Sequence, residues 1–398
     1  MLKHIQGGVC GPKGFAASGV HCGIRKNQQK PDLALIVSEV PCSAAAVYTQ
    51  NKVQGAPLTV TRQNIANGAA QGILCNSGNA NTCNPNGIEI AENCCALAAQ
   101  STGLTPQDFI VASTGVIGQP LPLAQVAAAA PLLPGALSRE GSADAVKAIM
   151  TTDLREKEIA VSFDLDGLPC TIGARAKASG RIHPNMATML IFITTDVAIS
   201  PAMLQKALGE VTVTTFNQIS IDNDTSTNDM AVVLASGLAG NDVIDGESTL
   251  YAQFVEALHA VCLHMSRLIA SDGEGATKLL ECKVTGAPTD ELARAVAKSV
   301  ISSELFKAAM FGEDANWGRA LCAIGYTPGN FSIDKVSVVL QSRGGSVKVC
   351  ENAAYHPYSE EAAADVLAKD TIEILVDLGL GDGTGAAWGC DLTYDYVK

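Results

Sequence analysis

The stretch Lys177–Asp196 reads KASGRIHPNMATMLIFITTD, and it decides how the middle of the chain folds. Its apolar run, Met189–Ile193, follows directly on a loop that contains Gly180 and Pro184. A run of roughly four to eight apolar, β-prone residues bounded by turn residues is typical of a buried strand. Proline fixes its own φ and restricts the residue before it, and glycine permits turns that other residues avoid. Thr188 is therefore predicted at the first position of a core strand, directly after a constrained loop.

Thr188 in this position is a candidate nucleophile against its own preceding peptide bond. Attack of its hydroxyl on the Ala187 carbonyl gives an ester, and hydrolysis of that ester leaves Thr188 as a new N-terminus. The new α-amine, with a reference pKa of about 7.7–8.0, can act as the base for its own hydroxyl. On these residues alone an ordinary junction of loop and strand is the better interpretation, because Ala-Thr before an apolar strand is common.

The segment His183–Leu190 reads HPNMATML, and other short polar or glycine-rich blocks are spread along the chain. These blocks are PKGF at 12–15, NSGNAN at 76–81, STGVIG at 113–118, DTSTND at 224–229, DGEGATK at 272–278, DANWGR at 314–319 and GDG at 381–383. In order and over nearly the whole chain they resemble the ornithine acetyltransferase family, the bifunctional glutamate N-acetyltransferases of arginine biosynthesis. His183–Leu190 is similar to the self-cleavage segment of that family, which favours cleavage between Ala187 and Thr188.

Two places depart from the family pattern. The family usually has Lys-Gly-Ser-Gly where this chain has Lys-Ala-Ser-Gly at 177–180, and we expect the added Cβ of Ala178 to tighten the loop without abolishing cleavage. Family chains typically run a few residues past the position of Lys398, into a segment whose Asn and terminal Thr line the substrate pocket. We therefore expect this 398-residue form to cleave itself but to transfer acetyl groups poorly.

Length and composition fit a packed enzyme of two or three domains. The chain has 398 residues, of which 47% are hydrophobic and 17% charged, which excludes a disordered chain. The net charge of −13 and the absence of a Lys/Arg cluster exclude a nucleic-acid footprint and disfavour anionic membranes. The N-terminal MLKHIQGG lacks the features of a targeting peptide, and no run approaches the roughly 18 apolar residues of a membrane span. We expect a cytoplasmic protein.

The 13 cysteines form no repeated C-x-x-C pair. Cys262 and His264 are close in sequence, but no second ligand pair follows at a spacing typical of zinc sites. The cysteines are better interpreted as buried free thiols in a reducing cytosol. We expect neither a metal nor a bound cofactor.

Short strands and helices alternate through most of the chain. Predicted strands are 33–37, 72–75, 109–112, 170–178 and 189–193, and predicted helices are 88–100, 123–133, 143–149, 201–208 and 249–271. Strands at 336–340, 347–349 and 371–375 indicate a smaller C-terminal α/β unit. The resemblance implies an α/β fold, a layered sandwich similar to N-terminal-nucleophile hydrolases of the aminopeptidase and ornithine acetyltransferase type. We expect an α chain at 1–187, the start of the β chain at 188–285 completing the catalytic domain, and a smaller domain at 286–398.

A threonine acyl-enzyme also needs donors for the oxyanion that forms during acyl transfer. By resemblance, Thr114 and Gly115 are the oxyanion residues of the family. Glycine lets a backbone N–H approach closely, and the Thr114 hydroxyl is a neutral donor; one such donor contributes about 3–4 kcal/mol. The same residues also fit a simple exit from a strand into a turn.

By resemblance, the substrate contacts fall on Thr151, Lys177, Thr188 and Glu274. Lys177 suits a substrate carboxylate and Glu274 suits the ammonium group of ornithine. Taken alone, Lys177 is more typical of a solvated loop and Glu274 of an exposed turn.

Three other motifs carry less weight. Gly273–Lys278 lacks the G-K-[ST] order of a phosphate-binding loop. The alternating glycines at 379–385 fail the G-x-G-x-x-G spacing, and we interpret them as turns near the pocket. His183 is interpreted as a structural loop residue because it precedes both the cleaved bond and Pro184.

The resemblance implies acetyl transfer from N2-acetyl-L-ornithine to L-glutamate through an acetyl-Thr188 intermediate, in an assembly of two α and two β chains. Some family members also accept acetyl-CoA, and the sequence does not distinguish the two kinds. Two alternatives stay open: a threonine-nucleophile aminopeptidase or amidase with water as acceptor, and an uncleaved protein that binds acetylated amino acids.

Overall fold

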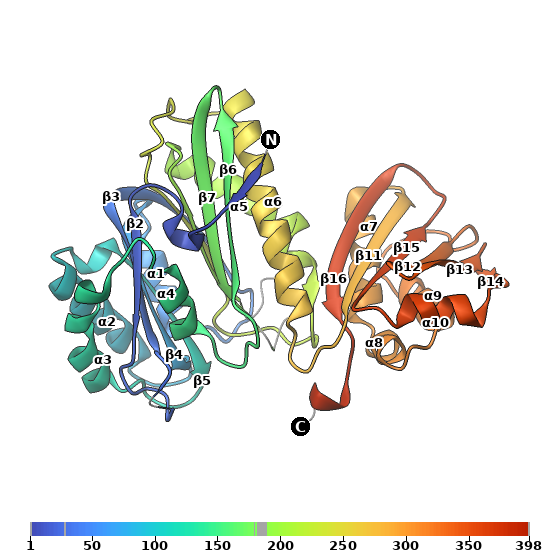
Figure 1. Ribbon diagram of the computed structural model, residues 1–398, viewed down its shortest axis with the longest axis horizontal. Helices are drawn as coiled ribbons and strands as arrows, with labels where there is room; N and C mark the ends of the chain where they lie inside the picture. The colour runs from blue at the N-terminus through green and yellow to red at the C-terminus, as the bar shows by residue number, and fades with distance from the viewer. Residues whose placement is uncertain (1, 28, 179, 181–188, 397–398) are drawn as a thin grey trace. The chain divides into compact units, whose positions relative to one another are not determined.

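The computed structural model describes residues 2–27, 29–178, 180 and 189–396 (Figure 1). These residues form two compact units. The N-terminal unit comprises residues up to 178 together with 189–212 and 225–265, and the C-terminal unit comprises 180, 213–224 and 266–396. Each unit is built on its own β-sheet with helices packed against it. The α/β class predicted from the sequence is confirmed.

Among the described residues, the N-terminal unit contains a nine-stranded sheet in the order β1-β6-β7-β8-β10-β3-β4-β5, with β2 paired to β3. Its strands are β1 (Lys3–Ile5), β2 (Phe15–Val20), β3 (Leu33–Tyr48), β4 (Ala69–Asn79), β5 (Phe109–Val116), β6 (Lys157–Leu165), β7 (Leu168–Lys177), β8 (Leu190–Thr195) and β10 (Met230–Ala235). The apolar run predicted after Thr188 is β8, which lies parallel to β10 and antiparallel to β7. All six residues of β8 are buried, as expected for a strand covered on both faces.

Helices cover both faces of the β3–β4–β5 part of this sheet (Figure 1). The helices of this unit are α1 (Ala56–Asn64), α2 (Gly87–Thr102), α3 (Leu123–Ala129) and α4 (Ser142–Ile149), with α5 (Pro201–Thr214) and α6 (Thr249–Ser271) beginning here. Successive β3 residues alternate between faces: Leu33 and Leu35 join the cluster with α2 and α3, whereas Ala34 and Ile36 join the cluster with α4. The predicted helix 123–133 ends early at Ala129, because Pro131 lacks the N–H that an α-helix requires.

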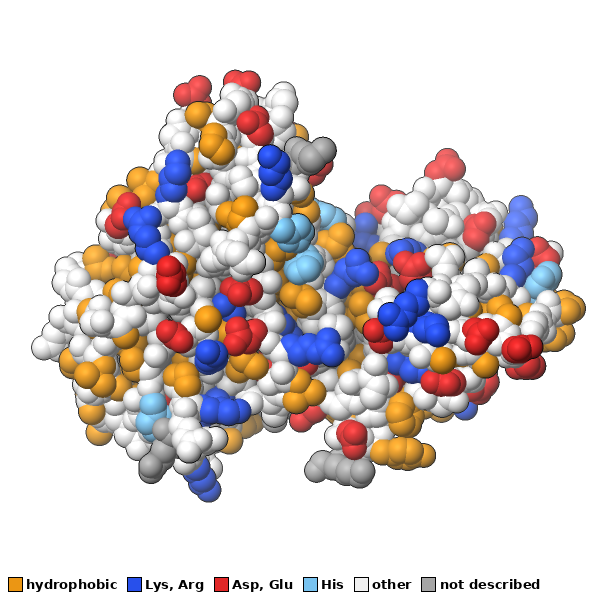
Figure 2. Space-filling model, viewed as in Figure 1, with side chains coloured by type: hydrophobic (Ala, Val, Ile, Leu, Met, Phe, Trp, Pro, Cys, Tyr) orange, Lys and Arg blue, Asp and Glu red, His pale blue; other side chains and the backbone are white. Residues whose placement is uncertain are grey.

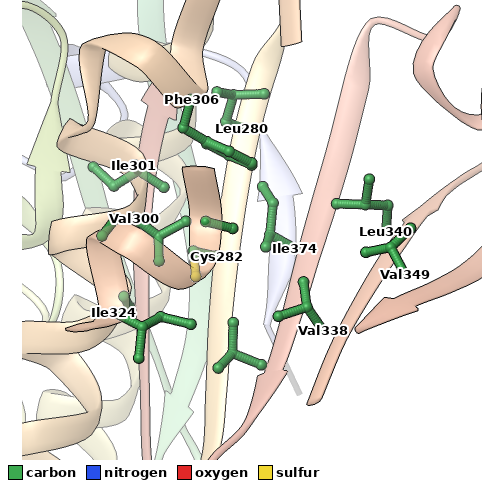
Figure 3. Close-up of a cluster of buried hydrophobic side chains, with 14 of the residues drawn as sticks. Leu280, Cys282, Val300, Ile301, Phe306, Ile324, Val338, Leu340, Val349 and Ile374 are labelled. Carbon is green, nitrogen blue, oxygen red and sulfur yellow. The ribbon is translucent and has the colours of Figure 1, made fainter. Parts of the chain in front are cut away.

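The C-terminal unit contains a seven-stranded sheet in the order β14-β13-β12-β15-β11-β16-β9 within the described ranges. Its strands are β9 (Ile219–Ser220), β11 (Leu279–Ala287), β12 (Ser337–Ser342), β13 (Gly345–Glu351), β14 (Ala354–Tyr355), β15 (Thr371–Asp377) and β16 (Gly383–Cys390). Its helices are α7 (Asp290–Ser302), α8 (Glu304–Phe311), α9 (Trp317–Gly325) and α10 (Glu360–Leu367). In Figure 3, Val300 and Ile301 of α7 point toward Leu280 and Cys282 of β11, in a core that includes Ile374.

Local sequence explains where the helices of this unit begin. The side chains of Thr289, Ser303 and Ser359 accept the backbone N–H groups at the starts of α7, α8 and α10, as N-cap residues do. The interpretation of the glycines at 379–385 as turns is wrong for Gly383 and Gly385, which lie in β16. A Cβ on either would come within 2.5 Å of the backbone of Thr289 or Arg294. These glycines therefore allow β16 to lie against the start of α7.

No helix among the described residues is long and apolar enough to cross a membrane. On the face shown in Figure 2, Lys and Arg side chains are interspersed with Asp and Glu. All cysteines are free thiols; most are buried, as the sequence predicts, and Cys83 and Cys322 are exposed.

Candidate active site

Asp229 fixes the first described residue after the predicted nucleophile. Its Oδ1 accepts the N–H of Met189 at 2.9 Å. The Met189 carbonyl in turn accepts the N–H of Met230 at 2.9 Å, which aligns the beginnings of β8 and β10. The predicted cleavage pair Ala187 and Thr188 lies outside the described residues, as does His183. The peptide N–H directly following Thr188 is thus held by a buried carboxyl group.

Asn228 links three of the sequence blocks that are far apart along the chain. Its side-chain amide donates to the carbonyl of Ala80 at 2.7 Å and to that of Ser113 at 3.0 Å. Its Oδ1 accepts the Thr82 hydroxyl at 2.6 Å. The blocks NSGNAN, STGVIG and DTSTND therefore meet at the start of β10, next to Asp229.

The predicted oxyanion pair lies at the end of β5. Thr114 is 5% exposed, and Gly115 has φ +137°, a conformation that favours glycine. A Cβ on Gly115 would collide with the carbonyl carbon of Gly78 on β4. The adjacent Ser113 hydroxyl donates to Asn76 Oδ1 at 2.6 Å, which holds the exit of β5 against that of β4. The ends of β4 and β5 thus pack so closely that only glycine fits at position 115. This packing also fixes the orientation of the peptide groups around Thr114.

A single buried carboxylate organises two of the predicted substrate residues. Oδ2 of Asp153 accepts the N–H of Thr151 at 3.0 Å, and its Oδ1 accepts the N–H of Ala178 at 2.9 Å and the ammonium of Lys157 at 2.8 Å. Lys177 and Lys157 are both nearly fully buried. Thr151 and Lys177 are therefore brought to the same carboxylate, although 26 positions separate them in the sequence.

The charges in this cluster depend on one another. Burial lowers the pKa of Lys177. The nearby Asp153 and Asp229 carboxyl groups act in the opposite direction and raise it, but burial has the larger effect. Burial alone would raise the pKa of Asp153, but the charges of Lys177 and Lys157 and the hydrogen bonds from Lys157 and Thr151 bring it below its usual value. The ionised form of Asp153 is thus favoured beside the buried side chains of Lys157 and Lys177.

The remaining predicted substrate residue, Glu274, belongs to the C-terminal unit and is exposed in the turn between α6 and β11. Asp391 shapes this loop by accepting the N–H groups of Thr277 and Lys278 at 2.8 and 2.9 Å. Within the same unit, a Cβ on Gly180 would collide with the Glu274 carboxylate. The exposed turn predicted for Glu274 from its residue type is correct, and its carboxylate is close to the glycine of the predicted cleavage loop.

Comparison with known proteins identifies the family. The family model described as the ArgJ family matches residues 16–398. The chain belongs to the ArgJ family. The arginine biosynthesis bifunctional protein ArgJ of Symbiobacterium thermophilum is 48% identical over 399 residues, covering 100% of this chain and 98% of that protein. The ArgJ protein of Caldanaerobacter subterraneus subsp. tengcongensis is 46% identical over 398 residues, with the same coverage of 100% and 98%. A crystal structure of argJ from Bacillus halodurans is 46% identical, with a TM-score of 0.49, and covers 52% of this chain and 95% of that one.

The resemblance inferred from the sequence blocks is thereby confirmed, and the match spans every predicted site residue of this ArgJ-family chain. Sequence reasoning nevertheless missed Asp153, Asn228 and Asp229. A signal was present for the last two, because an adjacent polar pair directly precedes the wholly apolar strand Met230–Ala235. Asp153 follows Thr151 by two positions, but its contacts with Lys157 and Ala178 exist only in the folded chain.

Proposed function

We propose that this protein is a bifunctional acetyltransferase of arginine biosynthesis, which moves an acetyl group from N2-acetyl-L-ornithine to L-glutamate. The observation that carries this proposal is the ArgJ family match over residues 16–398, together with curated ArgJ relatives at 48% and 46% identity over the whole chain. The buried cluster around Asp153, Asn228 and Asp229 supports an active site in the same part of the molecule.

In this mechanism Thr188 first cleaves the chain after Ala187 and then carries the acetyl group. Its hydroxyl attacks the acetyl carbonyl of acetylornithine, ornithine leaves, and the amine of glutamate accepts the acetyl group from the ester. Thr114 and Gly115 stabilise the oxyanion in both half-reactions, each donor contributing about 3–4 kcal/mol. The close strand packing at Gly115 supports this role, because a donor held by packing needs no reorganisation during the reaction.

Lys177 and Thr151 bind the substrate carboxylate, and Glu274 binds the side-chain ammonium of ornithine. A buried ammonium group is costly unless an anion accompanies it. Lys177 shares Asp153 with Lys157, so a substrate carboxylate would balance the second positive charge. This balance favours a carboxylate ligand over a neutral one.

The reaction requires neither a metal nor a cofactor. We propose an α chain of residues 1–187 and a β chain from 188, with 188–285 completing the catalytic domain and 286–398 forming a smaller one, assembled as two α and two β chains. A cytoplasmic location accords with the free thiols. Acetyl-CoA is a candidate second donor.

The test is incubation of the purified protein with N2-acetyl-L-ornithine and L-glutamate, with N-acetylglutamate, ornithine and acetate quantified. Formation of N-acetylglutamate together with ornithine, at whatever rate, would support the proposed transfer. Acetate in place of N-acetylglutamate would support the amidase alternative. A single band on a denaturing gel, together with no product of either kind, would support the uncleaved binding protein. Thr188→Ala is the inactive control, and Thr188→Ser, which keeps a hydroxyl, is its matched partner.

A further inference from the structure

Two positively charged side chains of the N-terminal unit have no hydrogen-bond acceptor within the described residues. Lys177 is only 4% exposed and Arg25 is half-buried. Neither the Lys177 ammonium nor the Arg25 guanidinium donates to a described group or forms an ion pair with a described carboxylate. Buried polar groups are nearly always hydrogen-bonded, and a buried charge is costly unless an anion accompanies it. Lys177 has a proposed ligand in the substrate carboxylate, whereas Arg25 has no role in the mechanism described so far.

The backbone of Arg25 is held in place by Asp32, which directly precedes β3 and is completely buried. Oδ1 of Asp32 accepts the N–H of Cys22 at 2.6 Å, and Oδ2 accepts the N–H of Arg25 at 2.8 Å. The carbonyl of Asp32 accepts the N–H of Ser77 at 3.0 Å. The loop that carries Arg25 is thereby tied to the end of β4, where the NSGNAN block lies.

The side chain of Arg25 packs beside the predicted oxyanion residues. A Cβ on Gly78 would come within 3.0 Å of Arg25 Cγ, and Gly78 is also the residue whose carbonyl carbon a Cβ on Gly115 would strike. Gly78 and Gly115 are register partners on β4 and β5. Because position 78 has no side chain, the stem of Arg25 lies directly against the backbone that packs on Gly115.

Arg25 also lies within electrostatic range of the cluster around Asp153. Burial lowers the pKa of the Arg25 guanidinium, while the charges of Asp32 and Asp153 act in the opposite direction. Burial is likewise the main cause of the lowered pKa of Lys177, and the positive charges of Lys157 and Arg25 add to it. Asp153 already accepts the Lys157 ammonium and two backbone N–H groups. An anion bound between the cations of Arg25 and Lys177 would therefore relieve their repulsion and accept their free donors.

We propose that Arg25 is a further substrate-binding residue, whose guanidinium and the Lys177 ammonium together hold the α-carboxylate of the amino acid that gives or receives the acetyl group. This inference rests on the proposed function, because it assumes that a substrate carboxylate binds at Lys177. A guanidinium presents parallel N–H donors that match the two oxygens of a carboxylate, whereas an ammonium acts as a point charge. Arg25 thus fixes the orientation of the carboxylate, and Lys177 balances its charge.

The position of Arg25 beside Gly78 favours the α-carboxylate over a side-chain carboxylate. In an N2-acetylated amino acid, the α-carboxylate and the acetylated nitrogen are attached to the same carbon atom. Standard bond lengths therefore keep the acetyl carbonyl carbon within roughly 4 Å of the carboxylate carbon. An α-carboxylate bound at Arg25 brings the acetyl group close to Thr114 and Gly115, the predicted oxyanion residues.

The test compares a substrate that has the carboxylate with one that lacks its charge. N2-acetyl-L-ornithinamide differs from N2-acetyl-L-ornithine only in that a neutral carboxamide replaces the carboxylate. With acetylornithine, Arg25→Gln should lower kcat/KM by roughly 10- to 100-fold, the usual effect of losing a hydrogen bond to a charged group. With the amide, the same substitution should leave kcat/KM nearly unchanged, because a neutral carboxamide gains little from the guanidinium charge.

Lys26→Gln is the matched control. Lys26 is the next residue in the same loop, and its side chain is exposed. This control removes the same charge from the loop but keeps the guanidinium beside Gly78, so kcat/KM for both substrates should equal that of the wild type. Arg25→Lys keeps the charge without the paired donors and should recover part of the loss.

A loss confined to acetylornithine supports the proposal. Equal losses with both substrates, as a purely structural role would give, overturn it, and so does an unchanged kcat/KM or an equal loss in Lys26→Gln. A wild type that transfers no acetyl group would count against the proposed function instead.

A labelling experiment on the wild type decides if Arg25→Gln does not fold or cleave itself, or if the wild type does not accept the amide. L-ornithine should protect Arg25 from modification by phenylglyoxal, as measured by mass spectrometry of the peptides, and L-ornithinamide should not. Arg139 is exposed and serves as the internal reference, which should react equally in all samples. Protection of Arg25 by both ligands or by neither would refute the carboxylate site, whether or not acetyl transfer is observed.

Discussion

Replacing Asp153 by Asn should destabilise the N-terminal unit more than any other single loss of charge described above. The Asp153 carboxylate accepts two backbone N–H groups and the Lys157 ammonium, and it lies beside a second buried ammonium, that of Lys177. Asn retains one acceptor oxygen but removes the negative charge that lies beside the buried side chains of Lys157 and Lys177. Breaking a buried ion pair by removing one partner costs about 3–5 kcal/mol. We expect a loss of that size in the free energy of unfolding.

Urea unfolding at neutral pH, followed by circular dichroism, measures this loss. Asp164→Asn is the matched control, because Asp164 is exposed and accepts the N–H of Gly167 at 2.7 Å in the β6–β7 hairpin. It should cost less than about 0.5 kcal/mol. The second variant Asp153→Asn/Lys157→Met removes a buried charge of each sign and should regain part of the loss.

The pH dependence follows from the lowered pKa of Asp153. A carboxyl group with a lowered pKa in the folded state contributes stability above its unfolded pKa of about 3.9, and this contribution is lost as the pH falls through the folded value. The difference between wild type and Asp153→Asn should therefore be constant near neutral pH and shrink below about pH 4. Equal losses for Asp153→Asn and Asp164→Asn, or a difference that persists in acid, would refute this electrostatic explanation.

Three further predictions concern cleavage, catalysis and stability. The wild type should give bands of about 19 and about 22 kDa on a denaturing gel, apart from trimming at exposed ends. Thr188→Ala should give one intact band. Two bands from that variant would exclude Thr188 as the nucleophile. Thr114→Ala should lower kcat by about 10²-fold with little change in KM, because an oxyanion donor acts on the transition state; a raised KM at constant kcat would instead indicate a contact with the bound substrate. Thr289→Ala should reduce the free energy of unfolding by about 1 kcal/mol through loss of the N-cap of α7, and Thr289→Ser should restore most of it, as urea titrations can measure.

Much of the fold was predictable from local pattern. The apolar run after Thr188 became β8, and the alanine-rich and amphipathic segments became α2, α4 and α6, because burial of one face requires a regular spacing of apolar residues. Glycines were harder to interpret, since the same residue type serves a turn and a close approach of two backbones. Gly383 and Gly385 allow a close approach of two backbones, those of β16 and the start of α7. The sequence did not reveal this contact, because α7 and β16 are far apart along the chain.

The candidate site residues were predicted from the family pattern, because residue type alone favoured a solvated loop for Lys177 and a simple strand exit for Thr114 and Gly115. Thr114, Gly115, Thr151 and Lys177 are found close to buried polar networks. The contacts of Asp153 and Asp229 were not predictable, because their partners Ala178 and Met189 lie 25 and 40 positions away in the sequence. An isolated aspartate is usually a surface residue, and only the folded chain distinguishes those that compensate buried charge.

The position of β8 and β10 in the sheet has a consequence for how a cleaved protein could be made. In the order β1-β6-β7-β8-β10-β3-β4-β5, both strands come from beyond residue 188, whereas their neighbours β7 and β3 come from before it. A cut after Ala187 would therefore leave the first fragment with a sheet in two pieces, each with an open edge prone to aggregation. The chain must therefore fold before it is cleaved. Refolding after cleavage would be difficult, because two separate fragments lose the high effective concentration of a single chain. Denaturation of the cleaved protein should then be irreversible in practice, while the uncut Thr188→Ala chain should refold.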